Sequence, residues 1–209
     1  MFLLDAPLTM REYMTHEPTP LADISRAIGD FLQGRHDVVV FGAHAVNAYV
    51  RVERMTLDVD LVAMEAKKIA TELRDYLARC FHIAVRVRAM TKRGAGFRVY
   101  QLTKPRNRSL VDVRQETRLP ASVSKGGVRF VEPVTLLAMK VQSYAARRNQ
   151  IKGDTDRVDI RRMLETWPRL RKRHGEVTDK LRTDGAPSHV LRTWYAFVDE
   201  RLAPDTDDY

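Results

Sequence analysis

Along the first part of the chain, segments with the apolar periodicity of a helix alternate with segments that have the pattern of a strand. Apolar residues recur every three or four positions over residues 21–32, which predicts a helix that begins after Thr19-Pro20 and ends at Gly34. A second amphipathic helix is predicted over residues 65–79. Residues 38–41 are continuously apolar, as expected of a strand buried on both faces of a sheet. Further strands are predicted over residues 81–89, 97–102, 109–115 and 128–131.

The pattern changes from strands to helices after residue 131. Apolar stripes predict helices over residues 133–148, from about residue 156 to Trp167, and over residues 187–202, with a turn at residues 151–155. We therefore expect an α/β (α+β) fold in two domains. Residues 1–131 would form a mixed sheet flanked by helices, and residues 132–209 a helical domain.

Two aspartates stand close together after a glycine turn. Gly42 follows the buried strand directly, and a helix is predicted from residue 43 to about residue 52. If the next strand includes residues 57–61, Asp58 and Asp60 share one face, about 7 Å apart, while Leu57 and its alternate neighbours point into a core. Adjacent carboxylates repel unless a cation lies between them, and hard divalent ions such as Mg²⁺ bind carboxylate oxygens. The pattern favours a metal site.

A third aspartate interrupts an apolar strand further along the chain. Asp112 shares its predicted strand face with Leu110 and Arg114. A carboxylate there is costly to bury without a partner. It could be a third ligand of the metal near Asp58 and Asp60. Alternatively, it lies at an exposed strand end or pairs with Arg114 or Arg98.

Composition limits the class of protein without naming a function. The 209 residues are 44% hydrophobic and carry a net charge of +9, so the chain can bury a core and favours an acidic partner, with nucleic acid ranked first. Cys80 is the single cysteine, which excludes an intramolecular disulfide and fits a reducing cytoplasm. We expect it to fill space in the core. No apolar run could span a membrane and no export signal is recognisable, so we expect a cytoplasmic protein without a membrane partner.

Three motifs occur in order along the chain: Gly42-Ala43, Arg54-x-Thr56-x-Asp58-x-Asp60-Leu61, and the later Asp112. Together they resemble the polymerase-β-type nucleotidyltransferase superfamily, whose motif is Gly-Ser or Gly-Gly followed by Asp-x-Asp. More narrowly, the chain resembles the AbiEii group of bacterial abortive-infection nucleotidyltransferase toxins. Lys140, followed by Asp156-x-x-Asp159, is similar to the Lys and Asp-x-x-Asp motifs of that group. The resemblance implies a polymerase-β-like sheet followed by a helical half.

The resemblance also implies a role for each matching residue. Two Mg²⁺ ions would bridge the phosphates of a nucleoside triphosphate and stabilise an in-line displacement. The implied metal ligands and catalytic residues are Asp58, Asp60 and Asp112, and the catalytic set is completed by Lys140 and Asp156. The implied nucleotide-binding residues are Gly42, Ala43, His44, Thr56 and Lys140. Ala43 departs from the motif, since a hydroxyl that would contact the triphosphate is missing there.

Positive charge is dense in the helical half and could seat a polyanion. The arginines that we expect to contact an acceptor are Arg147, Arg148, Arg161, Arg162, Arg171 and Arg173. The alternative is that these side chains lie on solvated helix faces.

Asp156 would lie in the first turn of its helix, where the helix dipole favours a carboxylate. Asp159 would lie beside the apolar stripe, with Arg162 or Lys140 as its partner.

The leading hypothesis is a Mg²⁺-dependent nucleotidyltransferase that adds nucleoside monophosphates to a nucleic acid, plausibly the 3′ end of tRNA. The resemblance implies a toxin of a toxin–antitoxin system, with a cognate antitoxin as a possible partner. A second enzymatic hypothesis has a small molecule or a protein hydroxyl as acceptor. A third is a non-catalytic RNA- or protein-binding module, against which the intact set of carboxylates argues.

Overall fold

The computed structural model describes residues 21–90 and 95–201. The described chain separates into two compact units. The first ends at Glu132 and the second begins at Pro133, but the short segment Tyr49–Arg51 belongs to the second unit. In the second unit, the ring of Tyr49 packs edge-on against Trp167 at a centroid distance of 5.2 Å. The division into two domains, residues 1–131 and 132–209, stays a prediction.

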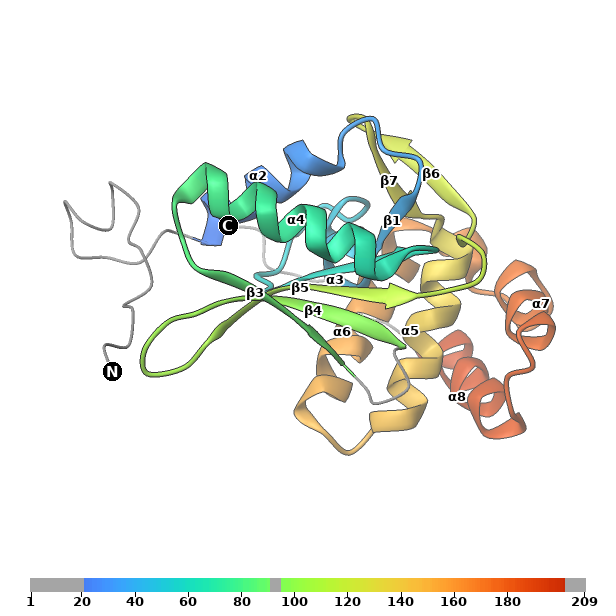
Figure 1. Cartoon of the computed structure of the whole chain (residues 1–209). Coiled ribbons are helices and arrows are strands. Elements are labelled where there is room, and N and C mark those ends of the chain that lie inside the picture. Colours follow the sequence, from blue (N-terminus) through green and yellow to red (C-terminus); the bar gives the residue numbers. More distant parts are fainter. Residues whose placement is uncertain (1–20, 91–94, 202–209) are drawn as a thin grey trace. The chain divides into compact units, whose positions relative to one another are not determined.

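The first unit is built on a seven-stranded mixed sheet (Figure 1). Its strand order is β3-β4-β5-β2-β1-β7-β6, with β2 parallel to β5, β1 parallel to β7, and the other neighbours antiparallel. The strands are β1 (Val38–Phe41), β2 (Val59–Ala63), β3 (Val85–Ala89), β4 (Gly96–Gln101), β5 (Arg108–Gln115), β6 (Ser122–Lys125) and β7 (Val128–Val131). The predicted mixed sheet is therefore confirmed, and β6 is a strand that the sequence pattern did not indicate.

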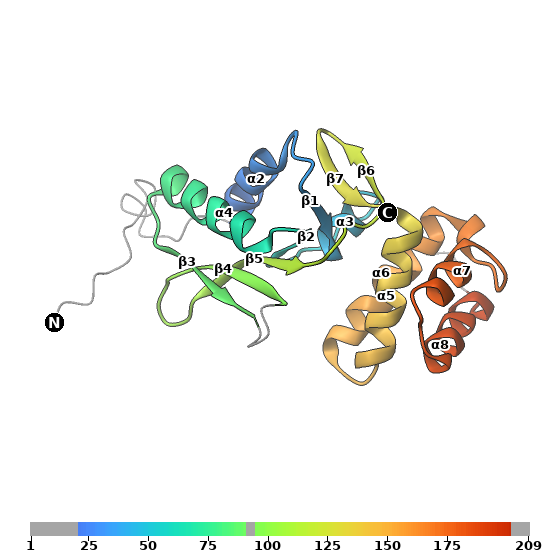
Figure 2. The ribbon, with the colours of Figure 1, turned by 45° about the vertical axis from the view of Figure 1, so that its right-hand side comes forward.

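Two helices cover one face of this sheet (Figures 1 and 2). They are α2 (Leu21–Leu32) and α4 (Ala66–Phe81), which pack on each other as well as on the strands. Most residues of their apolar stripes are buried, as at Ile24, Ile28 and Leu73, which are at most 2% exposed. At the edges of the stripes, Leu21, Phe31 and Tyr76 are partly exposed. The period of the apolar residues was thus a reliable guide to both helices. Cys80 near the end of α4 is exposed, so its predicted core position is wrong.

The chain between β1 and β2 differs from the prediction. The helix α3 (Gly42–Asn47) is short because Asn47, at its end, bonds to the backbone of Arg54: Nδ2 donates to the carbonyl at 2.8 Å, and Oδ1 accepts from the amide at 3.2 Å. The strand β2 begins at Val59, so Asp58 precedes the strand instead of lying on it. Leu57 is 67% exposed and does not point into the core.

The second unit is helical, as predicted (Figure 2). It contains α5 (Pro133–Arg147), α6 (Ile151–Thr166), the short 3-10 helix η1 (Pro168–Leu170), α7 (Glu176–Thr183) and α8 (Ser188–Asp199). Its core includes Trp194, whose indole N–H donates to the hydroxyl of Thr178 at 2.9 Å. Residues 151–155 form the first turns of α6, not a loop, and α7 was missed. None of the described helices has the length and apolar composition needed to cross a bilayer.

Candidate active site on the sheet

Gly42 lies directly against the side chain of Asp60. The register of β1 and β2 places Phe41 opposite Asp60, and Gly42 follows with a φ of +68°. A Cβ atom at Gly42 would lie 2.0 Å from Oδ2 and 2.9 Å from Cβ of Asp60. Only glycine combines this backbone conformation with this close approach. The glycine turn therefore positions the carboxylate of Asp60 at the start of α3.

Asp60 belongs to a row of charged side chains across three strands. The parallel register of β2 and β5 pairs Asp60 with Asp112, and the antiparallel register of β5 and β4 pairs Asp112 with Arg98. Residues in register on neighbouring strands point to the same face of a sheet. Because neighbouring strands are about 4.8 Å apart, each member of the row lies within reach of the next. The predicted proximity of Asp60 and Asp112 thus follows from the register.

Arg98 binds Asp112 with two N–H groups along one edge of its guanidinium group. Its Nε donates to Oδ1 and its Nη2 donates to Oδ2, each at 2.6 Å. This hydrogen bond raises the pKa of Arg98 against the lowering effect of burial, and the charges of Asp112, Asp58 and Asp60 raise it further. Of the alternatives weighed for Asp112, pairing with Arg98 is confirmed. A protein cation thus already lies in the field of all three aspartates.

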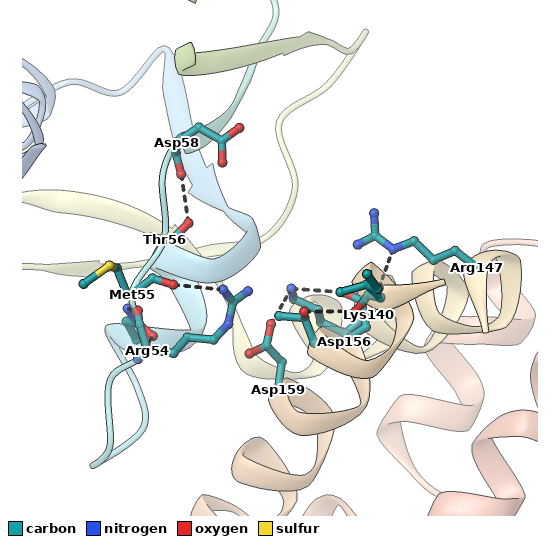
Figure 3. Close-up of polar contacts among 11 residues, drawn as sticks. Arg54, Met55, Thr56, Asp58, Lys140, Arg147, Asp156 and Asp159 are labelled. Carbon is teal, nitrogen blue, oxygen red and sulfur yellow. Dashed lines mark hydrogen bonds and ion pairs between the residues drawn. The ribbon is translucent and has the colours of Figure 1, made fainter. Parts of the chain in front are cut away.

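Asp58 is held by the loop that precedes β2 (Figure 3). The hydroxyl of Thr56 donates to the backbone carbonyl of Asp58 at 3.2 Å. Because Asn47 also fixes the backbone of Arg54, α3 and this loop form one bonded segment. Thr56 has a positioning contact, and its predicted contact with a nucleotide stays a prediction. Sequence reasoning missed Asn47, since an asparagine at the end of a helix has many possible partners.

Two further residues with predicted nucleotide contacts lie on α3. Ala43 is 5% exposed, so only its backbone remains available. The Nε2 atom of His44 is buried and has no hydrogen-bond partner among the described residues. Burial lowers the pKa of His44, while the charge of Asp58 opposes this change. Because the ordinary value is 6.5, His44 is a neutral imidazole at pH 7 and offers no positive charge to a triphosphate.

The carboxylate oxygens of Asp58, Asp60 and Asp112 are suitable ligands for a hard divalent cation. The arrangement of the three side chains is only partly suitable for one. Asp60 and Asp112 are in-register neighbours, and the missing side chain of Gly42 leaves room for the carboxylate of Asp60. Over residues 21–90 and 95–201, however, no three or more His, Cys, Asp or Glu side chains are arranged to hold a metal ion. Arg98 donates one hydrogen bond to each oxygen of Asp112. The assignment of the metal ligands stays a prediction.

A buried charge cluster in the helical unit

Lys140 is buried between two carboxylates of the helical unit (Figure 3). Its Nζ atom, on α5, donates to Oδ2 of Asp159 at 2.7 Å and to Oδ1 of Asp156 at 3.3 Å. The second oxygen of Asp156 accepts from Nε of Arg147 at 2.6 Å. Two cations and two anions thus neutralise one another. The predicted pairing of Lys140 with Asp159 is confirmed.

This geometry changes the interpretation of Asp156. The residue is the sixth of α6, not part of the first turn, and it is 1% exposed. The predicted position of Asp156 in the first turn, where the helix dipole would favour it, is therefore wrong. Its two cationic partners explain why a carboxylate is tolerated there. The catalytic role predicted for Lys140 and Asp156 stays a prediction.

Most of the predicted acceptor-binding arginines already have partners inside this unit. Arg161 and Arg173 form ion pairs with Glu200 and Asp199, at the end of α8. Arg171 donates to the carbonyl of Val198 at 3.0 Å. Arg147 binds Asp156 through its Nε atom. Arg171, Arg148 and Arg162 form no ion pair with any described residue, and for Arg148 and Arg162 no side-chain hydrogen bond to a described residue is found either.

Comparison with known proteins

The sequence matches no protein-family model and no curated protein. The structure is similar to the polyadenylate synthase of Megavirus, with a TM-score of 0.60 and 12% identity over 76% of this chain. The chain spans 34% of the length of that viral protein. It is also similar to JHP933 from Helicobacter pylori, with a TM-score of 0.50, 11% identity and 91% of each chain covered.

These similarities define the class of fold. The mixed seven-stranded sheet with flanking helices, followed by a helical part, is the polymerase-β-like nucleotidyltransferase fold. The nucleotidyltransferase toxin MenT4 from Mycobacterium tuberculosis is a more distant structural neighbour, with 15% identity over 61% of this chain and 59% of the toxin. Its TM-score of 0.38 is too low to show a shared fold. The predicted fold is confirmed, and the AbiEii group is not.

Proposed function

We propose that the protein is a metal-dependent nucleotidyltransferase that transfers a nucleoside monophosphate from a nucleoside triphosphate to a hydroxyl of a nucleic acid. The observation that carries the proposal is the position of Asp60. It is paired with Asp112 on the neighbouring strand and held against the glycine turn that opens α3. A pure binding module for a polyanion gains nothing from carboxylates placed together on this face.

The reaction assigns a task to each residue of the row. Asp60 and Asp112, with Asp58 from the preceding bend, would hold divalent cations, for which Mg²⁺ is the expected ion. When bound, such ions neutralise charge that develops on the phosphates. Asp112 would accept the proton of the attacking hydroxyl. A new bond from that oxygen to the α-phosphorus forms as the bond to the leaving pyrophosphate breaks.

Arg98 has a place in the same scheme. Its guanidinium group would compete with a bound cation, or with the proton of the attacking hydroxyl, for the oxygens of Asp112. A released guanidinium group next to the aspartates is well suited to a phosphate oxygen, because its planar fork matches phosphate geometry. Lys140 is less available for this task, since its ammonium group is bonded to Asp156 and Asp159.

The choice of a nucleic acid as the acceptor is based on the net charge of the chain and on its resemblance to a toxin family. A net charge of +9 favours a polyanion, and the resemblance to the AbiEii toxins favours RNA, in particular the 3′ end of tRNA. The same resemblance suggests a toxin that is controlled by a cognate antitoxin.

One incubation tests the proposal. Purified protein, Mg²⁺, each α-labelled nucleoside triphosphate in turn and total RNA should give labelled RNA and free pyrophosphate. Asp60→Asn and Asp112→Asn should each lower the rate at least about a hundredfold, or about 2.7 kcal/mol of transition-state stabilisation. Asp30→Asn, which removes an exposed charge on α2, is the matched control and should leave the rate unchanged.

Two results would contradict the proposal. One is wild-type transfer by Asp60→Asn. The other is label that enters only a small molecule or the protein itself, which would support a different acceptor class.

A further inference from the structure

A groove crosses the helical unit between the end of α5, α6 and α8. Its volume is about 600 Å³, within the range of about 300–1,000 Å³ that is usual for ligand sites. Tyr144 and Phe197 contribute to its lining and pack edge-on at a centroid distance of 5.2 Å. Both are at most 9% exposed, so they form its floor. Exposed basic side chains that also line the groove are Arg148, Arg157, His189 and Arg192.

The acidic side chains of the groove are already neutralised. Glu200 accepts from Arg157 at 3.1 Å and also pairs with Arg161, which lowers the pKa of Glu200. Asp199 is paired with Arg173. The carboxylates at this end of α8 therefore add no net negative charge to the groove.

Two of the arginines that line the groove, Arg148 and Arg192, are not neutralised in the same way. Arg148 forms no ion pair within the described part of the chain. With respect to the described residues, Arg192 makes no ion pair and one long side-chain hydrogen bond, 3.4 Å, to the hydroxyl of Ser188. These two guanidinium groups come from different segments, the end of α5 and the middle of α8, and line one cavity. The groove thus has a net positive charge on two sides.

We propose that this groove binds the phosphodiester backbone of the nucleic-acid acceptor, with Arg148 and Arg192 each in contact with a phosphate. A guanidinium group binds a phosphate with two parallel N–H bonds, and two such groups on separate segments suit a chain of phosphates. The inference rests on the proposed function for its choice of nucleic acid as the ligand. It also replaces most of the acceptor surface expected from the sequence, since only Arg148 belongs to both sets.

The test measures RNA binding without catalysis. A fluorescent single-stranded RNA of twenty nucleotides is titrated with the full-length protein at several salt concentrations. Arg148→Gln/Arg192→Gln should weaken binding at least tenfold at low salt. The plot of log K, the association constant, against log salt concentration should become less steep by about 1.4, because each phosphate contact of a single strand contributes about 0.7 to the slope. Lys67→Gln/Arg79→Gln removes two exposed positive charges on α4, outside the groove, and should alter neither quantity.

Each other outcome overturns the inference. Parallel salt plots for the double variant and the wild type would show that the groove does not bind the RNA backbone. An equal loss of affinity in Lys67→Gln/Arg79→Gln would show a non-specific effect of net charge. If the double variant instead loses binding of a mononucleotide such as ADP and keeps RNA binding, the groove is a site for free nucleotides.

The same protein preparations separate this inference from the proposed function. Asp60→Asn should bind the RNA like the wild type, because Asp60 does not line the groove. Loss of transfer with every nucleotide, together with groove-dependent RNA binding, would contradict the proposed reaction and support the groove. Transfer that persists in the double variant at saturating RNA, with a raised KM and an unchanged kcat, supports both.

Discussion

Replacement of Gly42 by alanine should lower the stability of the fold more than the same replacement at a glycine that also has a positive φ but has open space around it. An alanine at this φ costs about 1–2 kcal/mol in itself. The added Cβ would also meet Oδ2, Cγ and Cβ of Asp60 at 2.0, 2.7 and 2.9 Å. A rotation of the Asp60 side chain moves the first two atoms but not its Cβ, so the strands β1 and β2 must shift. Such overpacking costs a further amount of about 1–3 kcal/mol.

Gly34 is the matched control for this substitution. Its φ is +70°, and a Cβ there would meet nothing within 4 Å. Gly34→Ala therefore carries the backbone cost alone, and the difference between the variants isolates the contact with Asp60. At about 2–4 °C for each kcal/mol in a chain of this size, Gly42→Ala should melt about 2–12 °C below Gly34→Ala.

Two measurements decide this prediction. Thermal unfolding followed by circular dichroism gives the two melting temperatures. Titration with a fluorescent nucleoside triphosphate in the presence of Mn²⁺ should show weaker binding for Gly42→Ala only. Equal melting temperatures for the two variants would refute the reasoning that Gly42 is required by its approach to Asp60.

Three further substitutions test other contacts. Arg98→Met should lower the melting temperature of the metal-free protein and tighten Mn²⁺ binding, measured by calorimetry, because it frees both oxygens of Asp112; unchanged or weaker binding would contradict the proposed competition. Lys140→Met should cost about 3–5 kcal/mol in urea unfolding, since it leaves two buried carboxylates without their ammonium partner, and Asp159→Asn in the same chain should recover part of the loss. Glu200→Gln should reduce stability at pH 7 and flatten its dependence on acid pH. The pKa of Glu200 is lowered from an ordinary 4.5 by Arg161, so its contribution is present above pH 4.5 and is lost as the pH falls through the lowered value. Melting temperatures from pH 3 to pH 7 test this, and parallel curves would exclude it.

Periodic segments of this sequence predicted the fold well because burial fixes them. The continuous apolar run of β1 and the stripes of α2 and α4 had one possible interpretation each. Residues 52–58 were less certain, because alternation alone placed Leu57 in the core. In the structure, Thr56 bonds to the carbonyl of Asp58 and the strand starts later. The strand β6 and the helix α7 carried too few apolar residues to be recognised.

The site was predictable in its residues and less so in its partners. The proximity of Asp60 and Asp112 could be anticipated because both interrupt apolar strands. Their register could not be, since nothing local fixes which strands are neighbours. The charge of Arg98 was visible in the sequence, but its choice of Asp112 depends on the pairing of β4 with β5. The position of Asp159 beside the apolar stripe left Arg162 and Lys140 as possible partners, and the structure pairs it with Lys140. The burial of Asp156 could not be predicted, because it depends on where α6 begins.

The ion pair between Arg98 and Asp112 has a consequence for the folding of the newly synthesised chain. Several negative charges on one sheet face would oppose closure of that face if nothing balanced them. Arg98 comes from the neighbouring strand of the same chain, so it is present as soon as β4 and β5 pair. The newly synthesised chain therefore needs neither a metal ion nor a nucleotide to complete this sheet. Its abundance should accordingly not depend on the supply of either ligand during synthesis.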